Sequence, residues 1–356
     1  MQERERVVAV TGASGYLGRT LVAALAAEPS IARVLAFDLV PSPGAFADRR
    51  VVFDRLDVRD PALAARLQGV DVLVHLAFVM DPIRDENLMH DVNVNGSNNV
   101  FRCAGKAGVP RVVYASSGVA YGAHPDNDFP LTEDSPLRAN LDFNYAAHKL
   151  EVELLLAEVR ADFPQTSFCV LRPAIVFGPH VDNAWSHQLE LPVLLAVQGA
   201  DTRLQFVHED DVTRCLLHCV LNDLDGAFNL CPEDHVSLER IAELAGKRVV
   251  RLPEQVVYAL LARAWRLGLG EVPAGMLHYT IHPWVMTPAK LAGTGFSCER
   301  SSEQTLAEAI AALPDRVRFG RLAVGRSALR RGAVGVAVAA LAAAVVRGGR
   351  LRRAFW

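Results

Sequence analysis

One segment restricts the fold more than any other: residues 11–18 read TGASGYLG, between the apolar run VVAVTG and the helix-forming run TLVAALAAE. There, Gly12 allows a tight turn, Gly15 lets the backbone approach a pyrophosphate, and Gly18 lets helix and strand pack closely. The helix N-terminus adds amide donors and positive potential. The glycines could also form an ordinary βα turn, but their place after the first strand favours dinucleotide binding. The predicted contacts are Gly12, Ser14, Gly15, Tyr16, Leu17 and Gly18.

The second apolar run, VLAFDL, ends at an acidic residue, Asp38. It lies about twenty residues beyond Gly18, where a carboxylate can accept hydrogen bonds from both ribose hydroxyls of an adenosine. This favours NAD as the cofactor, because Asp38 would repel a 2′-phosphate and the next residues, Leu39 and Val40, offer no arginine to hold one. The alternative is a solvated carboxylate at a strand end.

Short apolar runs alternate with helical stretches from Val7 onward, including a long helix expected at 87–107. Several runs lack a polar alternate face, as in parallel strands covered by helices on both sides. The pattern predicts an α/β fold of the Rossmann type, a doubly wound parallel sheet. We expect residues 1–180, completed by about 204–231, to form the cofactor-binding domain. Residues 181–203 and 232–315 would form a smaller substrate-binding part, followed by a tail at 316–356.

Composition excludes several classes of protein. A chain of 356 residues with 51% hydrophobic content can bury a large core. The formal net charge is -3, although residues 316–356 contain arginines and no Asp, Glu or Lys, so the body is acidic. An acidic body argues against nucleic acid as the main ligand. The six cysteines are scattered, so reduced thiols and a cytoplasmic location are expected.

The sequence YAAHK places Tyr145 and Lys149 four residues apart, on one face of a predicted helix. A tyrosine is a poor base at neutral pH, but an adjacent ammonium favours the phenolate and lowers its pKa. Such a pair could also be an ordinary surface pair. Upstream, YASSGVAYG follows a buried strand, so Ser117 would lie at the carboxyl edge of the sheet, where ligands of open α/β folds bind. We therefore predict Ser117, Tyr145 and Lys149 as a catalytic set for hydride transfer at a secondary alcohol or ketone carbon.

The ordered motifs TGASGYLG, LDVRD, HLAF, NVNGSNNV, YASSGVAYG, YAAHK, LRPAIVFGP and QFVHEDDV resemble an extended short-chain dehydrogenase/reductase of the NAD-dependent epimerase/dehydratase family over residues 7–315. The resemblance implies a homodimer. It also implies further cofactor contacts: Asp57 and Val58 near the adenine, Leu76 and Ala77 through their backbone, Asn93, Tyr145 and Lys149 in the catalytic region, and Pro173 with Val176 beside the nicotinamide. Alternatively, Asp57 caps a turn, Asn93 pins a helix, and Pro173 shapes a strand end.

Two groups of residues imitate metal ligands. His208, Asp210 and Asp211 occur together in QFVHEDDV, and Cys215, His218 and Cys219 follow on a predicted helix. No second pair completes a tetrahedral set. We expect caps, buried anchors and core residues here, and no metal.

Three reactions compete for the predicted site. In sugar 4,6-dehydratases an acidic pair follows the catalytic hydroxyl, whereas Gly118, Val119 and Ala120 follow Ser117 here, which disfavours dehydration. A nucleotide-sugar 4-epimerase is the leading interpretation, although Leu204 and Gln205 stand where family epimerases usually have an arginine that grips the diphosphate. Arg203, one position earlier, is the candidate substitute. The alternative is oxidation of a hydrophobic alcohol, similar to the 3β-hydroxysteroid dehydrogenase branch. A hypothesis of another class is a non-catalytic NAD-binding protein.

The tail contains an apolar run, residues 332–346, flanked by arginines. This run is shorter than the twenty or so apolar residues that a membrane-spanning helix needs. We expect either peripheral contact with an anionic membrane or docking onto the acidic body. A poorly ordered extension is the alternative.

Overall fold

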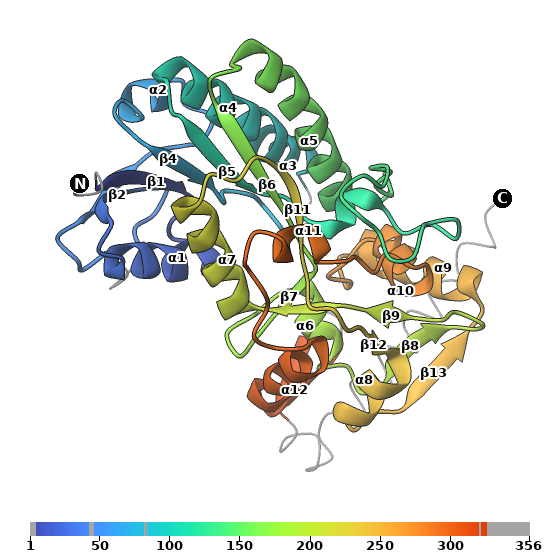
Figure 1. Cartoon of the computed structure of the whole chain (residues 1–356). Helices are drawn as coiled ribbons and strands as arrows, with labels where there is room; N and C mark the ends of the chain where they lie inside the picture. The colour runs from blue at the N-terminus through green and yellow to red at the C-terminus, as the bar shows by residue number, and fades with distance from the viewer. Residues whose placement is uncertain (1–4, 43–45, 82, 84, 320–321, 326–356) are drawn as a thin grey trace.

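A seven-stranded parallel sheet in the order β3-β2-β1-β4-β5-β6-β11 forms the centre of the structure (Figure 1), a computed structural model that describes residues 5–42, 46–81, 83, 85–319 and 322–325. The strand order reverses between β1 and β4, and ligands of open α/β sheets bind at such a reversal. The strands are β1 (Arg6–Thr11), β2 (Ile31–Asp38), β3 (Val51–Arg55), β4 (Val72–His75), β5 (Arg111–Ala115), β6 (Ser167–Pro173) and β11 (Gly226–Leu230).

Helices cover both faces of this sheet, which explains why all four residues of β4 are buried. Alternate strand residues face opposite layers: Val8 and Val10 pack with one group of helices, and Ala9 packs with the other. On one face lie α1 (Tyr16–Ala27) and α7 (Glu209–Leu221), and on the other α2 (Leu63–Arg66), α4 (Gly96–Ala107) and α5 (Asn144–Asp162) (Figure 1). The predicted doubly wound α/β fold is confirmed.

The long helix expected at 87–107 contains an irregularity. It consists of α3 (Glu86–His90), a π-helical turn η1 (Asp91–Asn95) and α4. The Asp85 side chain caps its start by accepting a hydrogen bond from the Leu88 amide at 2.9 Å. The π-helical turn widens the helix beside the carboxyl end of β4 and buries Asn93 there.

The smaller part is built from short strand pairs and helices after Gly178. The stretch 204–231 was expected to complete the main domain. Its first strand, β10 (Phe206–His208), pairs with β7 (Ile175–Phe177) outside the main sheet, and the chain rejoins the main sheet at β11. The other pairs are β9 (Arg203–Leu204) with β12 (Val236–Ser237), and β8 (Leu194–Val197) with β13 (Val249–Leu252). The remaining helices are η2 (Gly118–Tyr121), α6 (Ala184–Gln188), α8 (Leu238–Leu244), α9 (Glu254–Arg266), η3 (Ala274–Leu277), α10 (His278–Ile281), α11 (Ala289–Ala292) and α12 (Ser302–Ala312).

The first residues of the predicted tail form a two-stranded antiparallel pair, β14 (Arg316–Phe319) and β15 (Leu322–Gly325). The apolar run 332–346, for which membrane contact was predicted, lies outside the described residues. Within the described ranges, every helix is too short or too polar to cross a bilayer.

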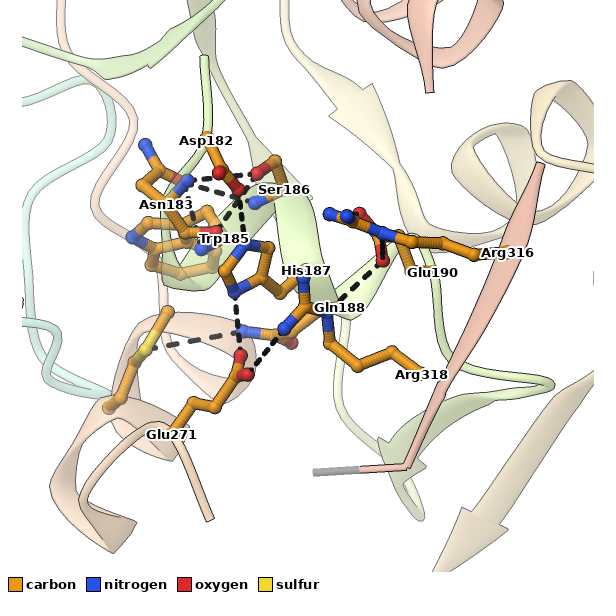
Figure 2. A network of polar contacts seen from close by, with 11 residues as sticks. Asp182, Asn183, Trp185, Ser186, His187, Gln188, Glu190, Glu271, Arg316 and Arg318 are labelled. Atoms are coloured by element: carbon orange, nitrogen blue, oxygen red, sulfur yellow. Dashed lines mark hydrogen bonds and ion pairs between the residues drawn. The ribbon is translucent and has the colours of Figure 1, made fainter. Parts of the chain in front are cut away.

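Two arginines of β14 bind one buried carboxylate (Figure 2). Arg316 and Arg318 lie two residues apart, so both side chains leave the strand on the same side. Arg316 donates two hydrogen bonds to Glu190, at 2.7 and 2.8 Å, and Arg318 donates one at 3.1 Å. Arg318 also binds Glu271 at 2.7 Å, and Glu271 lies 2.7 Å from His187 of α6. The network therefore attaches β14 to the smaller part of the protein.

Candidate functional site

A cavity of about 230 Å³ lies at the carboxyl ends of β1, β2 and β4. Several predicted cofactor contacts line it, namely Gly12, Gly15, Asp38, Asp57, Val58, Leu76 and Ala77. Further lining residues were not predicted: Phe37, Leu39, Leu56, Phe78, Val79 and Val92. The cavity therefore lies where the sequence placed the adenosine half of a dinucleotide.

The turn at Gly12 has the geometry that only glycine provides. Its φ is +72°, and a Cβ atom there would lie 2.6 Å from the backbone nitrogen of Ala77. A Cβ atom on Gly18 would lie 2.8 Å from the Cα atom of Ala13, so helix and turn pack backbone to backbone. The first turn of α1 contains no acidic residue, and Gly15 caps it without a side chain. Its amides are free to bind an anion such as a pyrophosphate.

The carboxylate of Asp38 is held in place at the rim of this cavity. Its two oxygens accept hydrogen bonds from the backbone amides of Ser14, at 2.9 Å, and Leu39, at 2.7 Å. Each carboxylate oxygen can accept a second hydrogen bond, so both stay available to ribose hydroxyls. The glycine turn, the open helix N-terminus and Asp38 together fit NAD.

The remaining predicted residues of the glycine segment do not line the cavity. The Ser14 hydroxyl donates to the carbonyl of Val40 at 2.5 Å, which closes the loop after β2. Leu17 packs against the core, and the buried Tyr16 hydroxyl has no hydrogen-bond partner among the described residues.

Asp57 lines the cavity, but its carboxylate binds Arg59. The two side chains are joined by hydrogen bonds of 2.6 and 3.0 Å, and Asp57 also accepts the Arg59 backbone amide at 2.9 Å. The hydrogen bond from the Arg59 guanidinium holds the pKa of Asp57 below its ordinary value. The carboxylate thus stabilises the turn after β3, and Val58 supplies the apolar wall.

Asn93 holds the loop that follows β4. Its side chain accepts the Val79 amide at 2.7 Å and donates to the Val79 carbonyl at 3.0 Å. It supports the cavity wall without lining the cavity. Pro173 is buried at the end of β6 and Val176 is half-buried in β7, and neither lines the cavity.

Ser117, Tyr145 and Lys149 lie at the carboxyl end of β5 and the start of α5. The Lys149 ammonium donates to the carbonyl of Ala115 at 2.7 Å and lies 3.5 Å from the ring centroid of Phe78, a cation–π contact. The Tyr145 ring meets Phe78 edge-on, with centroids 5.7 Å apart. Because Phe78 also lines the cavity, it connects Tyr145 and Lys149 to the cofactor site.

The electrostatics of this set differ from the expectation. Burial raises the pKa of Tyr145 to about 12, and the hydrogen bond to Ser117 opposes this shift only in part. Burial also lowers the pKa of Lys149 to about 7, against the attraction of Glu153. Burial therefore favours the neutral phenol of Tyr145, opposite in direction to the phenolate expected from the YAAHK spacing, and the Lys149 ammonium contacts Ala115 and Phe78.

A buried ion pair that the sequence analysis missed lies behind the catalytic turn. Glu153 binds Arg172 at 2.6 Å and accepts a hydrogen bond from Ser116 at 2.5 Å. Arg172 also donates to the Tyr121 hydroxyl at 2.7 Å. This network fixes Ser116 and hence the direction of its neighbour Ser117. The signal was the arginine inside the apolar strand SFCVLRPAIVFG, since a buried guanidinium requires a carboxylate partner.

Met286, from the smaller part of the protein, fills the space next to Gly118, the residue after Ser117. A Cβ atom on Gly118 would lie 2.8 Å from the Sδ and Cε atoms of Met286. Tyr279 donates to the Val119 carbonyl at 2.8 Å and holds the same turn. An acidic side chain following Ser117 would have to displace Met286.

The residues that imitate metal ligands have structural contacts. His208 caps α7 by accepting the Asp210 amide at 3.1 Å. Asp211 is fully buried and accepts the backbone amides of Glu299 at 3.0 Å and Arg300 at 3.3 Å. Across the described part of the chain, no three His, Cys, Asp or Glu side chains are grouped to hold a metal ion. The three other candidates lie on α7: Cys215, His218 and Cys219.

Comparison with known protein families agrees with this site. The family model described as the NAD-dependent epimerase/dehydratase family matches residues 8–231. The chain belongs to this family. Its cofactor is NAD, and the resemblance noted from the motifs is confirmed.

Individual relatives extend the match. An uncharacterised protein of Mycobacterium tuberculosis is 32% identical over 262 residues, which cover 72% of this chain and 70% of that protein. Short-chain dehydrogenase/reductase family 42E member 1 of Danio rerio is 30% identical, over 57% of this chain and 55% of that protein. The structure of UDP-glucose 4-epimerase with UDP-glucose from Thermotoga maritima has a TM-score of 0.65 at 19% identity and covers 86% of this chain and 98% of that chain. That structural likeness supports the fold alone.

Proposed function

We propose that this protein is an NAD-dependent oxidoreductase that moves hydride at a secondary alcohol or ketone carbon. One observation supports this most: Phe78 lines the cofactor cavity and also contacts Tyr145 and Lys149. A group that transfers protons therefore lies next to a site that fits NAD. A non-catalytic NAD-binding protein has no need of this arrangement.

Each residue of the set has a distinct role. NAD, when bound, accepts or returns the hydride. Tyr145 is a phenol at neutral pH, so it donates its proton to the substrate oxygen as a ketone is reduced. The Ser117 hydroxyl donates a hydrogen bond to the same oxygen and stabilises developing negative charge. Lys149 lies one helical turn from Tyr145 on α5, and its pKa of about 7 lets it gain or lose a proton near neutral pH.

The first candidate reaction is that of a nucleotide-sugar 4-epimerase. It needs hydride removal and return but no acid at the position after Ser117, and Gly118 with Met286 leaves no free space for one. The structural neighbour from Thermotoga maritima is an epimerase of this kind.

The second candidate is a dehydrogenase acting on a hydrophobic alcohol. Leu204 is buried where the resemblance places a diphosphate-binding arginine. Arg203 is turned toward Asp201, at 2.6 Å, and lies 5.3 Å from the ring centroid of Phe129. Adjacent residues of a strand point to opposite faces, so Arg203 does not replace the missing cation on the side of Leu204.

Product analysis separates the two reactions. Full-length protein is incubated with NAD and UDP-hexoses or, separately, with sterol-like alcohols. Epimer formation without net NADH supports the epimerase, and stoichiometric NADH supports the dehydrogenase. Tyr145→Phe should lower either activity at least about 100-fold, the usual contribution of a positioned proton donor, while the variant still binds NAD. NAD binding without turnover of any substrate, or full activity in Tyr145→Phe, would contradict the proposal.

The homodimer, the cytoplasmic location and the division into a domain at 1–180 with 204–231 and a substrate part at 181–203 with 232–315 stay predictions. Gel filtration, cell fractionation and limited proteolysis are the measurements that address them.

A further inference from the structure

A buried histidine lies behind the cofactor cavity. His75 is the last residue of β4 and is 1% exposed. Its Nδ1 lies 2.7 Å from the Thr11 hydroxyl, and its Nε2 lies 2.9 Å from the Ser97 hydroxyl. The imidazole also stacks on Tyr114, with centroids 5.7 Å apart. Both ring nitrogens are therefore occupied in a site without solvent.

The hydrogen bonds determine which nitrogen bears the proton. Burial, and secondarily the nearby Lys149 ammonium, lower the pKa of His75 to about 3, so the ring is neutral. The Ser97 hydroxyl donates its single proton to the Asn93 carbonyl at 2.5 Å, because a carbonyl can only accept. Ser97 must then accept from Nε2–H, and Nδ1 must accept from the Thr11 hydroxyl. The chain of hydrogen bonds runs in one direction, from Thr11 to Asn93.

This chain joins the two walls of the cavity. Thr11 immediately precedes Gly12, and His75 immediately precedes Leu76. The other end of the chain is Asn93, whose side chain holds both backbone groups of Val79. Gly12, Leu76 and Val79 all line the cavity, and the backbone at Gly12 is in contact with the loop after β4. A shift of either wall therefore changes the width of the site.

We propose that His75, as the neutral Nε2–H tautomer, is a positioning residue that fixes the Gly12 turn against the loop after β4 and so determines the affinity for NAD. A doubly protonated ring would direct two donors at Thr11 and Ser97 and would reverse the hydrogen bond from Thr11. The inference rests on NAD as the cofactor and not on the choice between epimerase and dehydrogenase.

Isothermal titration of NAD into full-length variants tests the positioning role. Ser97→Ala and Thr11→Val each leave one nitrogen of His75 without its partner, and we expect the Kd for NAD to rise about tenfold in each. Thr11→Ser keeps the hydroxyl and should bind NAD as the wild type does. Ser167→Ala is the matched control, since the Ser167 hydroxyl also donates to a backbone carbonyl, that of Pro110, but at the opposite edge of the sheet.

Nitrogen-15 NMR of labelled histidines measures the tautomer, with His75→Asn used to assign the signal. The wild type should show a protonated Nε2 and no titration between about pH 5 and 8, where an ordinary histidine titrates. In Ser97→Ala the proton should move to Nδ1, because Thr11 can accept it. This shift is a readout that a merely space-filling histidine would not give.

Two results would overturn the inference: a wild-type His75 protonated at Nδ1, or NAD affinities within about twofold of the wild type, 0.4 kcal/mol, in both hydroxyl-deletion variants. The wild-type spectrum decides the tautomer even where a variant fails to fold. Absence of NAD binding by the wild type would instead reject the cofactor and the proposed function, and the tautomer could still be read.

Discussion

Replacing Arg318 by methionine should destabilise the protein more than replacing any exposed arginine. The Arg318 side chain is 10% exposed and Glu190 is 3% exposed. Removing one partner of a buried ion pair costs about 3–5 kcal/mol. Arg316 still donates two hydrogen bonds to Glu190 in this variant, so we expect a smaller loss than this range, about 2–3 kcal/mol. For a chain of 356 residues that corresponds to a decrease in Tm of about 3–4 °C.

The comparison variants isolate the buried pair. Arg316→Met should cost about 1 kcal/mol, because that side chain is one third exposed and its charge is screened. Arg240→Met is the matched control: Arg240 also bridges two glutamates, Glu243 and Glu303, but on the surface, where solvent screens the charges, so we expect little change in stability. Truncation after residue 315 removes both arginines of β14, so it should lower Tm relative to a chain that ends after residue 325 and keeps them.

The pH dependence gives a second measurement. Burial alone would raise the pKa of Glu190, but hydrogen bonds from Arg316 and Arg318 outweigh it and hold the pKa below its ordinary value. A lowered pKa in the folded state contributes stability above the unfolded pKa, about 4.3, and this contribution is lost as the pH falls through the folded pKa. The difference between wild type and Arg318→Met, measured by calorimetry, should therefore shrink below about pH 4. A Tm of Arg318→Met within about 1 °C of that of Arg240→Met at pH 7 would refute the reasoning.

Three further variants test the site. Gly12→Ala should raise the Kd for NAD at least about tenfold, because φ is +72° and the new Cβ meets Ala77; unchanged affinity in a calorimetric titration would contradict this. Asp38→Ala should weaken the binding of NAD and reduce the preference for NAD over NADP, measured as the ratio of the two Kd values. Lys149→Met should remove a pH dependence of stability. The free energy of unfolding of the wild type rises between about pH 7 and 10, because in this range only the unfolded state keeps the Lys149 proton. Urea unfolding at several pH values measures this rise, and the same rise in wild type and variant would contradict the prediction.

Much of the fold follows from local sequence. The glycine turn is recognisable in part because Gly18 packs against the backbone of Gly12 and Ala13, a contact between neighbours in the sequence, whereas the contact of Gly12 with Ala77 on the loop after β4 is not local. The strands were found because β4 and its neighbours are buried on both faces and read as continuous apolar runs. Asp38 could be placed because its position follows from the end of β2.

Properties set by distant residues could not be predicted in this way. The pKa of Tyr145 depends on burial, and Phe78, whose ring packs edge-on against that of Tyr145, lies on the loop after β4, so the YAAHK spacing contains none of that information. Arg316 and Arg318, which the sequence assigned to the tail, lie in β14 and bind the buried Glu190. Arg316 and Glu190 are 126 residues apart in the sequence. Likewise, QFVH has the composition of a main-sheet strand, and only the course of β7 shows which partner it takes.

The π-helical turn at Asp91–Asn95 accommodates one residue more than a regular helical turn would hold between α3 and α4. Each residue advances an α-helix by about 100°, and a π turn holds one more residue than a regular turn. Losing a single residue there would leave a regular turn, so α3 and α4 would form one continuous α-helix and keep their relative orientation. Homologues one residue shorter in this stretch are therefore expected to have a regular α-helix, with the bulge that carries Asn93 removed.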